Sequence, residues 1–266
     1  MNLSESSILW LNDYLFNCTK QYMKFLIIIL IAINFGLNAQ TAEEYISLGR
    51  DKYNKDDYKG GILDFNKAIE LNPSLTEAYF YRGWSKYRLQ DYTGAIADHS
   101  KSIEIDPNQS KSRQLASTAY YCRAMAKDAL RDYRGSVADY TKDIELKPNK
   151  SSYYNRAKAK EELKDYRGAV ADYTKAIELS PYELAPNWLG YHYDRANVKF
   201  KLKDFHGVMV DCNKLLELDP NNDFAYYLRG FAKYNLYDLD GACIDWSKAG
   251  ELGFNEAYDA IKNYCN

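Results

Sequence analysis

The chain has 266 residues, of which 35 are basic, 37 are acidic and 26 are tyrosines. This near-neutral balance excludes the broad positive field that nucleic acid or an anionic membrane surface requires of a partner. Tyrosine buries a large ring and keeps a polar tip, so its frequent use suits both interfaces between packed elements and binding faces.

The first forty residues differ from the rest. Lys24 precedes an uncharged run over residues 25–37, and Asn38, Ala39 and Gln40 follow it. The run is short for a bilayer span. A cation, a short apolar core and a small residue before a polar junction are typical of a secretory signal peptide. The sequence therefore predicts an exported chain, periplasmic or secreted.

We expect the signal peptide at 23–39, with cleavage after Ala39. Residues 1–22 make an odd start for such a peptide, so we interpret them as an upstream extension and Met23 as the true initiator. Cleavage would leave no membrane-inserted segment. The alternative is an uncleaved membrane anchor formed by residues 25–39.

A run of ten residues recurs six times along the remaining chain. Copies ending in proline lie at 64–73, 98–107, 139–148, 172–181 and 211–220, and the copy at 245–254 has lost its proline. A period near 34 residues predicts an array of helical hairpins rather than one closed globule. Arrays of this kind offer long surfaces, which favours binding over catalysis.

The segment 76–109 shows the organisation of one repeat. Its first half has large and small apolar residues at helical spacing, and Gln90, Asp91 and Tyr92 interrupt this pattern. The second half, from Thr93 to Ile105, is again helical in pattern, and Pro107 ends it because proline cannot continue the helix. The predicted unit is helix, tight turn, helix, turn.

This pattern resembles the tetratricopeptide repeat (TPR) family, as the aromatic, small and proline positions of repeat 1 illustrate: Tyr45, Leu48, Gly49, Gly61, Phe65, Ala68 and Pro73. The resemblance extends over about residues 42–256. It implies an all-α, right-handed solenoid of about six hairpins, at approximately 42–75, 76–109, 117–149, 150–183, 189–222 and 223–256. Residues 255–265 are expected to form a capping helix.

Each expected hairpin turn carries an aspartate followed three residues later by a glycine: Asp57 and Gly60, Asp91 and Gly94, Asp132 and Gly135, Asp165 and Gly168, Asp204 and Gly207, and Asp238 and Gly241. An aspartate at this place can cap the second helix or hold the turn. A catalytic role is implausible for a residue that recurs six times, so we interpret this pair as structural.

Five repeats place arginine where the family usually has leucine, and each has an aspartate on its second helix: Arg82 and Asp98, Arg123 and Asp139, Arg156 and Asp172, Arg195 and Asp211, and Arg229 and Asp245. A buried unpaired charge is very costly. We therefore favour a ladder of internal ion pairs. The alternative is a cationic groove for acidic ligands. Repeat 1 has Leu48 instead of arginine.

The cysteines are few enough to consider singly. Cys243 and Cys265 lie on the two sides of Gly253, so an antiparallel helix pair would bring them side by side. A disulfide between them is reasonable in an oxidising compartment. Cys122 and Cys212 lie in helices of different repeats, and we expect both to be unpaired.

Two insertions interrupt the period. The residues near 110–116 could lengthen the following helix or form a longer loop. The residues near 184–188 bring Pro186 and Trp188 beside several tyrosines, and such insertions lie near binding faces as often as they are neutral.

The resemblance implies that the first helices line a concave groove, which here would be aromatic with few charges: Tyr53, Phe80, Trp84, Tyr87, Tyr121, Tyr154, Tyr193, Phe200, Tyr227, Phe231 and Tyr234. Exposed aromatic residues in a concavity are typical of protein or peptide recognition. We expect about half of these rings to serve instead as packing between neighbouring first helices.

The sequence contains no recognisable catalytic constellation. His99, His192 and His206 occupy three different repeat positions, and none has metal-ligand spacing with another histidine or with cysteine. A phosphate-binding glycine loop and a nucleophile elbow are also missing. We therefore expect a non-enzymatic scaffold without cofactor or metal that binds a protein or peptide in the aromatic groove. The alternative is a structural subunit of an envelope complex that binds through its convex face.

Overall fold

The computed structural model describes residues 22–24, 40–106, 113–180 and 188–265. Within these ranges every regular element is a helix, as the sequence predicts: α2 (Ala42–Asn54), α3 (Tyr58–Leu71), α4 (Thr76–Arg88), α5 (Tyr92–Ile105), α6 (Arg113–Ala129), α7 (Tyr133–Leu146), α8 (Lys150–Glu162), α9 (Tyr166–Glu178), α10 (Trp188–Lys201), α11 (Phe205–Leu218), α12 (Asp223–Asn235), α13 (Leu239–Glu251) and α14 (Glu256–Tyr264). The expected apolar segment 25–39 lies outside the described residues. In the described part of the chain, no helix is both long and apolar enough to span a membrane.

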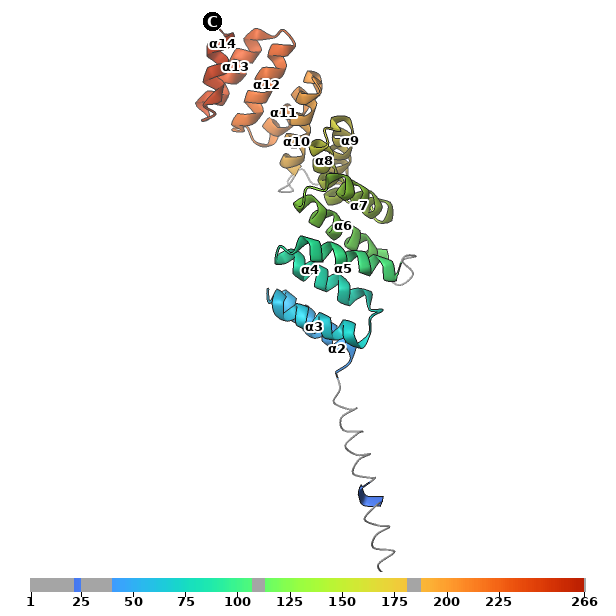
Figure 1. Cartoon of the computed structure of the whole chain (residues 1–266). Coiled ribbons are helices and arrows are strands. Elements are labelled where there is room, and N and C mark those ends of the chain that lie inside the picture. Colours follow the sequence, from blue (N-terminus) through green and yellow to red (C-terminus); the bar gives the residue numbers. More distant parts are fainter. Residues whose placement is uncertain (1–21, 25–39, 107–112, 181–187, 266) are drawn as a thin grey trace, which may run out of the picture.

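The helices stack in chain order into an elongated array (Figure 1). Even-numbered helices from α2 to α12 are the first helices of the hairpins, and the odd-numbered helices that follow them are the second. Each helix contacts the helices before and after it in the chain, and α14 packs on α13. The stack runs from α2 and α3 at one end to α14 at the other. The expected fold, an all-helical solenoid of hairpins with a terminal helix, is confirmed.

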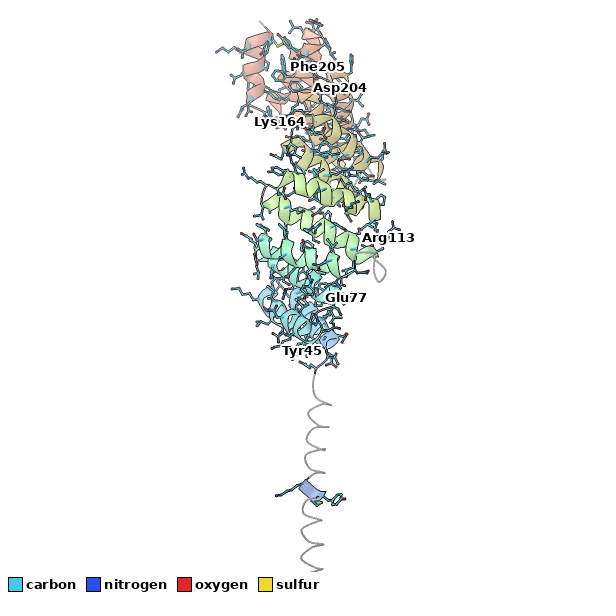
Figure 2. The ribbon with its side chains drawn as sticks, turned by 45° about the vertical axis from the view of Figure 1, so that its right-hand side comes forward. Tyr45, Glu77, Arg113, Lys164, Asp204 and Phe205 are labelled. Atoms are coloured by element: carbon cyan, nitrogen blue, oxygen red, sulfur yellow. A yellow bond between two sulfur atoms is a disulfide. The ribbon has the colours of Figure 1, made fainter. Side chains whose placement is uncertain are left out.

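The hairpin turns share one backbone geometry. The residue before each capping aspartate has a positive φ of 60–66°: Asp56, Gln90, Arg131, Lys164, Lys203 and Tyr237. The aspartate then accepts a hydrogen bond of 2.9–3.0 Å from the backbone N–H of the glycine three residues later. The expected cap at the start of every second helix is confirmed. Lys164 and Asp204, in two of these turns, are labelled in Figure 2.

At one position of the second helix, facing the first, five of the six hairpins bury an aromatic ring and the other buries a cysteine. The equivalent second-helix positions hold Phe65, His99, Tyr140, Tyr173, Cys212 and Trp246, all 0–1% exposed. The contact with Trp246 is tight, because a Cβ on Gly230 would lie 2.5 Å from the indole Nε1 atom. This explains the small residues that the sequence places on the first helices.

The two insertions are described only in part. Residues 113–116 form the first turn of α6, which at 17 residues is longer than its neighbours. This favours a lengthened helix for that part of the insertion, while residues 110–112 lie outside the described residues. Of the second insertion the structure describes only Trp188, which begins α10, is 4% exposed and packs against His192 with 4.1 Å between ring centroids.

Candidate functional site

The side chains that α2, α4, α6, α8, α10 and α12 turn outward form what we call the first-helix face. Across repeats α2 contacts α4, and α4 contacts α6. On this face Phe80 is buried at 5% exposure, whereas Tyr193 and Tyr234 are 37% and 38% exposed. The other expected groove residues are half-buried: Tyr53, Trp84, Tyr87, Tyr121, Tyr154, Phe200, Tyr227 and Phe231.

Many of these rings link neighbouring helices. The Tyr121 hydroxyl accepts a hydrogen bond from Asn155 Nδ2 at 3.0 Å, and the Tyr154 hydroxyl donates to Asp194 Oδ2 at 2.7 Å. Burial raises the pKa of both tyrosines. Tyr121 and Tyr154 are therefore held by polar contacts to the next first helix.

At the C-terminal end of the first-helix face, rings of α12 pack against α13, the turn that follows it and α14. Phe231 packs against Trp246 at 4.9 Å, and Tyr234 against Tyr264 of α14 at 4.6 Å, both between ring centroids. Tyr227 lies 4.4 Å from the Phe254 ring. Tyr227 and Phe231 are half-buried by these contacts, whereas Tyr234 remains 38% exposed.

Two cavities open along one side of α6, facing α8. The first, which we call the hydroxyl cavity, has a volume of about 270 Å³, and its lining includes Thr118, Tyr121 and Ser151. The second, the tyrosine cavity, has about 380 Å³ and includes Tyr87, Tyr133 and Tyr140. Their α6 residues are 114, 117, 118, 121, 125, 128 and 129, a spacing that places them on one helix face.

The hydroxyl cavity contains a buried carboxylate that our sequence analysis missed. Asp143 is 2% exposed and accepts hydrogen bonds from the hydroxyls of Ser117 and Ser152 and from Asn149 Nδ2. The equivalent positions hold Ala68, Ser102, Ala176, Leu215 and Ala249. The sequence could have indicated Asp143, because it is the only charged residue among these six equivalent positions.

The tyrosine cavity contains a second unpredicted acid. Asp128 Oδ2 accepts a hydrogen bond of 2.8 Å from the Tyr140 hydroxyl. Burial raises the pKa of Asp128, and hydrogen bonds from Ser136 and Tyr140 oppose this rise. Glu162 lines the same cavity. The site therefore combines aromatic walls with two carboxyl groups.

The structure brings each arginine of the predicted ladder to its aspartate. Arg82, Arg123, Arg156, Arg195 and Arg229 place Nη2 at 2.5–2.7 Å from an Oδ1 atom of Asp98, Asp139, Asp172, Asp211 and Asp245, respectively. The arginine side chains are 12–18% exposed and the aspartates 0–5%. These guanidinium groups lie between helices and do not line either cavity along α6.

A lysine four residues after each arginine completes the network, and sequence reasoning missed it. Lys86, Lys127, Lys160, Lys199 and Lys233 lie 2.7–2.9 Å from the same aspartates. In repeat 1, which lacks the arginine, Lys52 pairs with Asp64 at 2.7 Å. The recurring Arg-x-x-x-Lys spacing carried this signal, since residues four apart share a helix face.

The arginines also join successive repeats. Nη1 of Arg82 donates to Asn66 at 2.7 Å, and Nη1 of Arg156 donates to Thr141 at 3.0 Å, so each guanidinium reaches the second helix of the preceding hairpin. The equivalent partners of the other arginines are Ser100, Thr174 and Asn213. The ladder therefore links hairpins to one another as well as the two helices within each.

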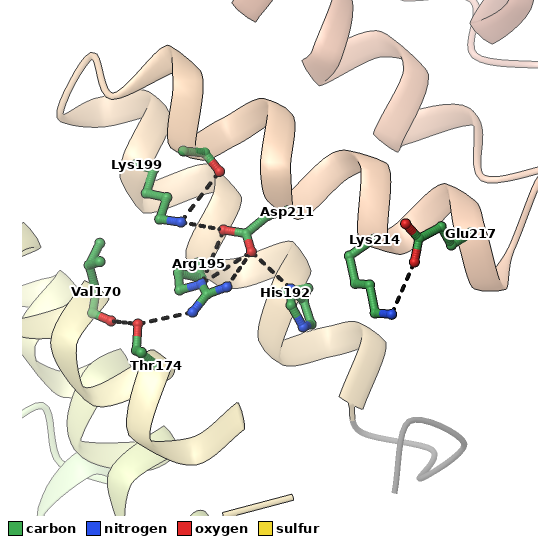
Figure 3. A network of polar contacts seen from close by, with 9 residues as sticks. Val170, Thr174, His192, Arg195, Lys199, Asp211, Lys214 and Glu217 are labelled. Carbon is green, nitrogen blue, oxygen red and sulfur yellow. Dashed lines mark hydrogen bonds and ion pairs between the residues drawn. The ribbon is translucent and has the colours of Figure 1, made fainter. Parts of the chain in front are cut away.

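Figure 3 shows the ladder in repeat 5, where a histidine joins it. His192 Nδ1 lies 2.8 Å from Asp211 Oδ1, and Arg195 and Lys199 bind the same carboxylate. Burial alone would raise the pKa of Asp211, but hydrogen bonds from the three partners and the Arg195 charge outweigh it and lower the value to about 2. Asp211 is therefore ionised at any ordinary pH.

The cysteines fall into two classes. A disulfide joins Cys243 of α13 to Cys265 beyond α14, with 5.8 Å between the Cα atoms. Cys122 and Cys212 are free and buried. Burial raises the pKa of the Cys212 thiol to about 12 and raises that of Cys122 as well, so neither is a reactive nucleophile. Among the described residues, no cluster of three or more His, Cys, Asp or Glu side chains could hold a metal ion.

Comparison with known families finds one match. The profile of the tetratricopeptide repeat family matches residues 151–183, which correspond to the hairpin of α8 and α9. A search of curated proteins finds no significant match. One hairpin of the array is thus recognisable as a TPR from its sequence.

Solved structures share the fold. A TPR protein described as having an unusual peptide-binding site, YrrB, is 19% identical over 74% of this chain and 97% of its own, with a TM-score of 0.64. The C-terminal part of a TPR-containing protein from Cytophaga hutchinsonii is 16% identical over 82% and 87%, with a TM-score of 0.66. A TPR protein from Parabacteroides merdae is 18% identical over 86% and 100%, with a TM-score of 0.56. These likenesses show a TPR-type solenoid.

Proposed function

We propose that this protein is an exported, non-enzymatic scaffold that binds a protein or peptide along the concave first-helix face. The observation that carries the proposal is the pair of open cavities between α6 and α8, which follow one face of α6 for its whole length. Exposed clefts with aromatic walls and convergent polar groups suit peptide recognition. The peptide-binding site named for YrrB is consistent with this use of the fold.

Polar groups that could receive a peptide line both cavities. Asn155 lies beside Tyr121, to whose hydroxyl its side-chain amide donates a hydrogen bond at 3.0 Å. Ser151 is exposed at the edge of the hydroxyl cavity. An extended segment lying along α6 would meet hydroxyl and amide groups that can pair with its backbone, together with hollows for its side chains.

The test is a matched pair of bulky substitutions in the full chain. Ser151→Trp places an indole in the mouth of the hydroxyl cavity, and Ser247→Trp places one at an exposed residue of the second helix α13. We expect partners co-purified from the native envelope to be lost from the first variant and kept by the second. Equal retention by both would exclude the α6–α8 face as the binding site.

Export is proposed on separate grounds. The apolar run before Ala39 has the features of a signal peptide, and the disulfide between Cys243 and Cys265 requires an oxidising compartment to persist. N-terminal sequencing of the mature protein should give Gln40 as the first residue. A mature protein that still contained residues 25–39 would support the membrane-anchored alternative.

A second candidate function is a structural subunit that binds through its second helices. Leu63, Val210 and Ile244, at one equivalent position of α3, α11 and α13, are 66%, 63% and 68% exposed. Large exposed apolar side chains can mark an interaction surface. Replacing all three by serine should release the partner under this candidate, whereas the proposed concave binding would be unaffected.

A further inference from the structure

The equivalent sites of two other hairpins show what the tyrosine cavity lacks. In the next repeat Glu161 accepts a hydrogen bond from the Tyr173 hydroxyl, and Lys201 Nζ lies 3.3 Å from its other oxygen. The same ammonium lies over the Tyr166 ring, 5.4 Å from the centroid. A cation is thus held between a carboxylate and an aromatic face, both of which attract it.

The tyrosine cavity contains the equivalent carboxylate and tyrosine rings but no cation between them. Asp128, Tyr140 and Tyr133 occupy the positions of Glu161, Tyr173 and Tyr166, and the position of Lys201 holds Glu162. The Asp128 carboxylate accepts from Tyr140 in the way that Glu161 accepts from Tyr173. A carboxylate therefore stands where the next repeat has a lysine, and two acids face the cavity.

The hairpin of α2 and α3 has its own cation at this position. The guanidinium of Arg88, the α4 residue equivalent to Lys201, lies 4.6 Å from the Tyr58 ring centroid and 3.4 Å from Asp56. The tyrosine that begins a second helix thus binds a cation of the following repeat at Tyr58 and at Tyr166. At Tyr133 the chain supplies Glu162 in its place.

The lysine that lines the tyrosine cavity does not fill this place. Lys158 Nζ lies 3.4 Å from Asp194 and 5.6 Å from the Tyr154 ring centroid, so its ammonium is directed toward α10. In the part of the chain that the structure describes, Asp128 and Glu162 have no ion-pair partner. The raised pKa of Asp128, which burial causes, is consistent with a carboxylate that lacks a cation.

We propose that the tyrosine cavity binds a basic side chain of the partner, a lysine ammonium or an arginine guanidinium, in the place that Lys201 occupies in the next repeat. The cation lies between Asp128 and Glu162 and against the Tyr133 ring, while its alkyl stem contacts Met125 and Tyr87. This inference deepens the proposed function, on which it rests, by assigning a charge to the ligand. The volume of about 380 Å³ accommodates such a side chain.

The test is an NMR titration of the ¹⁵N-labelled full chain with N-acetyl-lysine methylamide. We expect shifts of the amide resonances of Asp128, Tyr133 and Glu162, and none with N-acetyl-norleucine methylamide, which has a similar stem but no charge. Asp128→Asn should weaken binding of the lysine probe by about tenfold or more, because a charge-assisted contact is lost. Equal shifts with the two probes, or an unchanged affinity in Asp128→Asn, would overturn the proposal.

A variant that places a lysine of the chain itself in the proposed cation site provides a second test. Glu162→Lys recreates the arrangement of Lys201, so the variant should lose the lysine probe and gain thermal stability. Glu145→Lys makes the same charge change at an exposed residue of α7 that pairs with Lys142, and it should still bind the probe. Full binding by Glu162→Lys would count against the inference.

The two proposals fail in different ways. If Ser151→Trp releases the native partner while Asp128→Asn retains it and the lysine probe does not bind, the groove is used and the cation site is not. If the lysine probe binds but Ser151→Trp still retains the partner, the cavity recognises cations while the native partner binds elsewhere.

Discussion

At the scale of single residues, His99 departs most clearly from its environment. It occupies the fully buried second-helix position that Phe65 and Trp246 fill elsewhere, and its ring lies 3.0 Å from the place of a Cβ on Gly83. Neither ring nitrogen has a hydrogen-bond partner among the described residues. Burial lowers the pKa of His99 to about 4; the Asp98 charge opposes this shift, and the Arg123 charge adds a smaller lowering.

This predicts a stability that depends on pH. Between about pH 6.5 and pH 4 the unfolded chain binds a proton at His99 and the folded chain does not, so stability falls as the pH is lowered through this window. The loss is on the order of 3 kcal/mol when complete. His99→Phe should remove this loss, and urea unfolding at several pH values measures it.

The matched control is His206→Phe, because His206 is exposed on α11. Its substitution should leave the pH dependence of the wild type in place. If His99→Phe lost stability between pH 6.5 and pH 4 as steeply as the wild type, burial of a neutral imidazole would not be the cause.

At the scale of elements, each second helix begins with the same cap. Asp165 Oδ1 accepts a hydrogen bond from the Gly168 N–H at 3.0 Å, and a Cβ on Gly168 would lie 2.1 Å from Asp165 Oδ2. Glycine is unfavourable in a helix, but here it leaves room for the capping carboxylate. The cap and the glycine therefore form a unit in each hairpin.

A double-mutant cycle tests this coupling. Gly168→Ala should destabilise the wild type because the methyl group displaces the Asp165 carboxylate, which is worth about 1 kcal/mol as a cap. In the Asp165→Ala background the same change should stabilise by about 1 kcal/mol, the helix preference for alanine. Urea unfolding of the four proteins gives the coupling free energy. An effect of Gly168→Ala with the same sign and size in both backgrounds would refute it.

At the scale of the whole molecule, the array is held together by contacts between neighbours. Each helix packs on the helices next to it in the chain, and the ladder arginines join each hairpin to the preceding one. Stability in such an array is approximately a sum of local terms. The disulfide at one end should therefore stabilise that end and leave the stability of the distant hairpins unchanged.

Reduction of the Cys243–Cys265 disulfide tests this locality. The bond closes 22 residues of sequence separation and should contribute about 3 kcal/mol to the cap. Hydrogen exchange should become faster in α13 and α14 after reduction or in Cys265→Ser, with α2 to α5 unchanged. Faster exchange over the whole array would show that the hairpins unfold together.

The fold was largely predictable because the residues that form the hairpins recur at a regular spacing along the chain. The spacing of the recurring run indicated hairpins, the Asp-x-x-Gly pairs indicated the turns, and the position of Cys265 relative to Gly253 suggested which helices would meet. The candidate site was less predictable. The sequence predicted that about half of the aromatic rings would serve as packing, but it could not say which ones. The contacts of Phe231 and Tyr234 with Tyr264, for example, depend on where α14 lies.

The sequence by itself therefore determined the repeat, its caps and the pairing of charges in register, since these depend on contacts within or between adjacent hairpins. Only the tertiary structure decided which surface is open. Asp128 and Asp143 line cavities that exist because α6, α7 and α8 pack around them. Such properties depend on the packing of three helices, and no spacing along one helix encodes them.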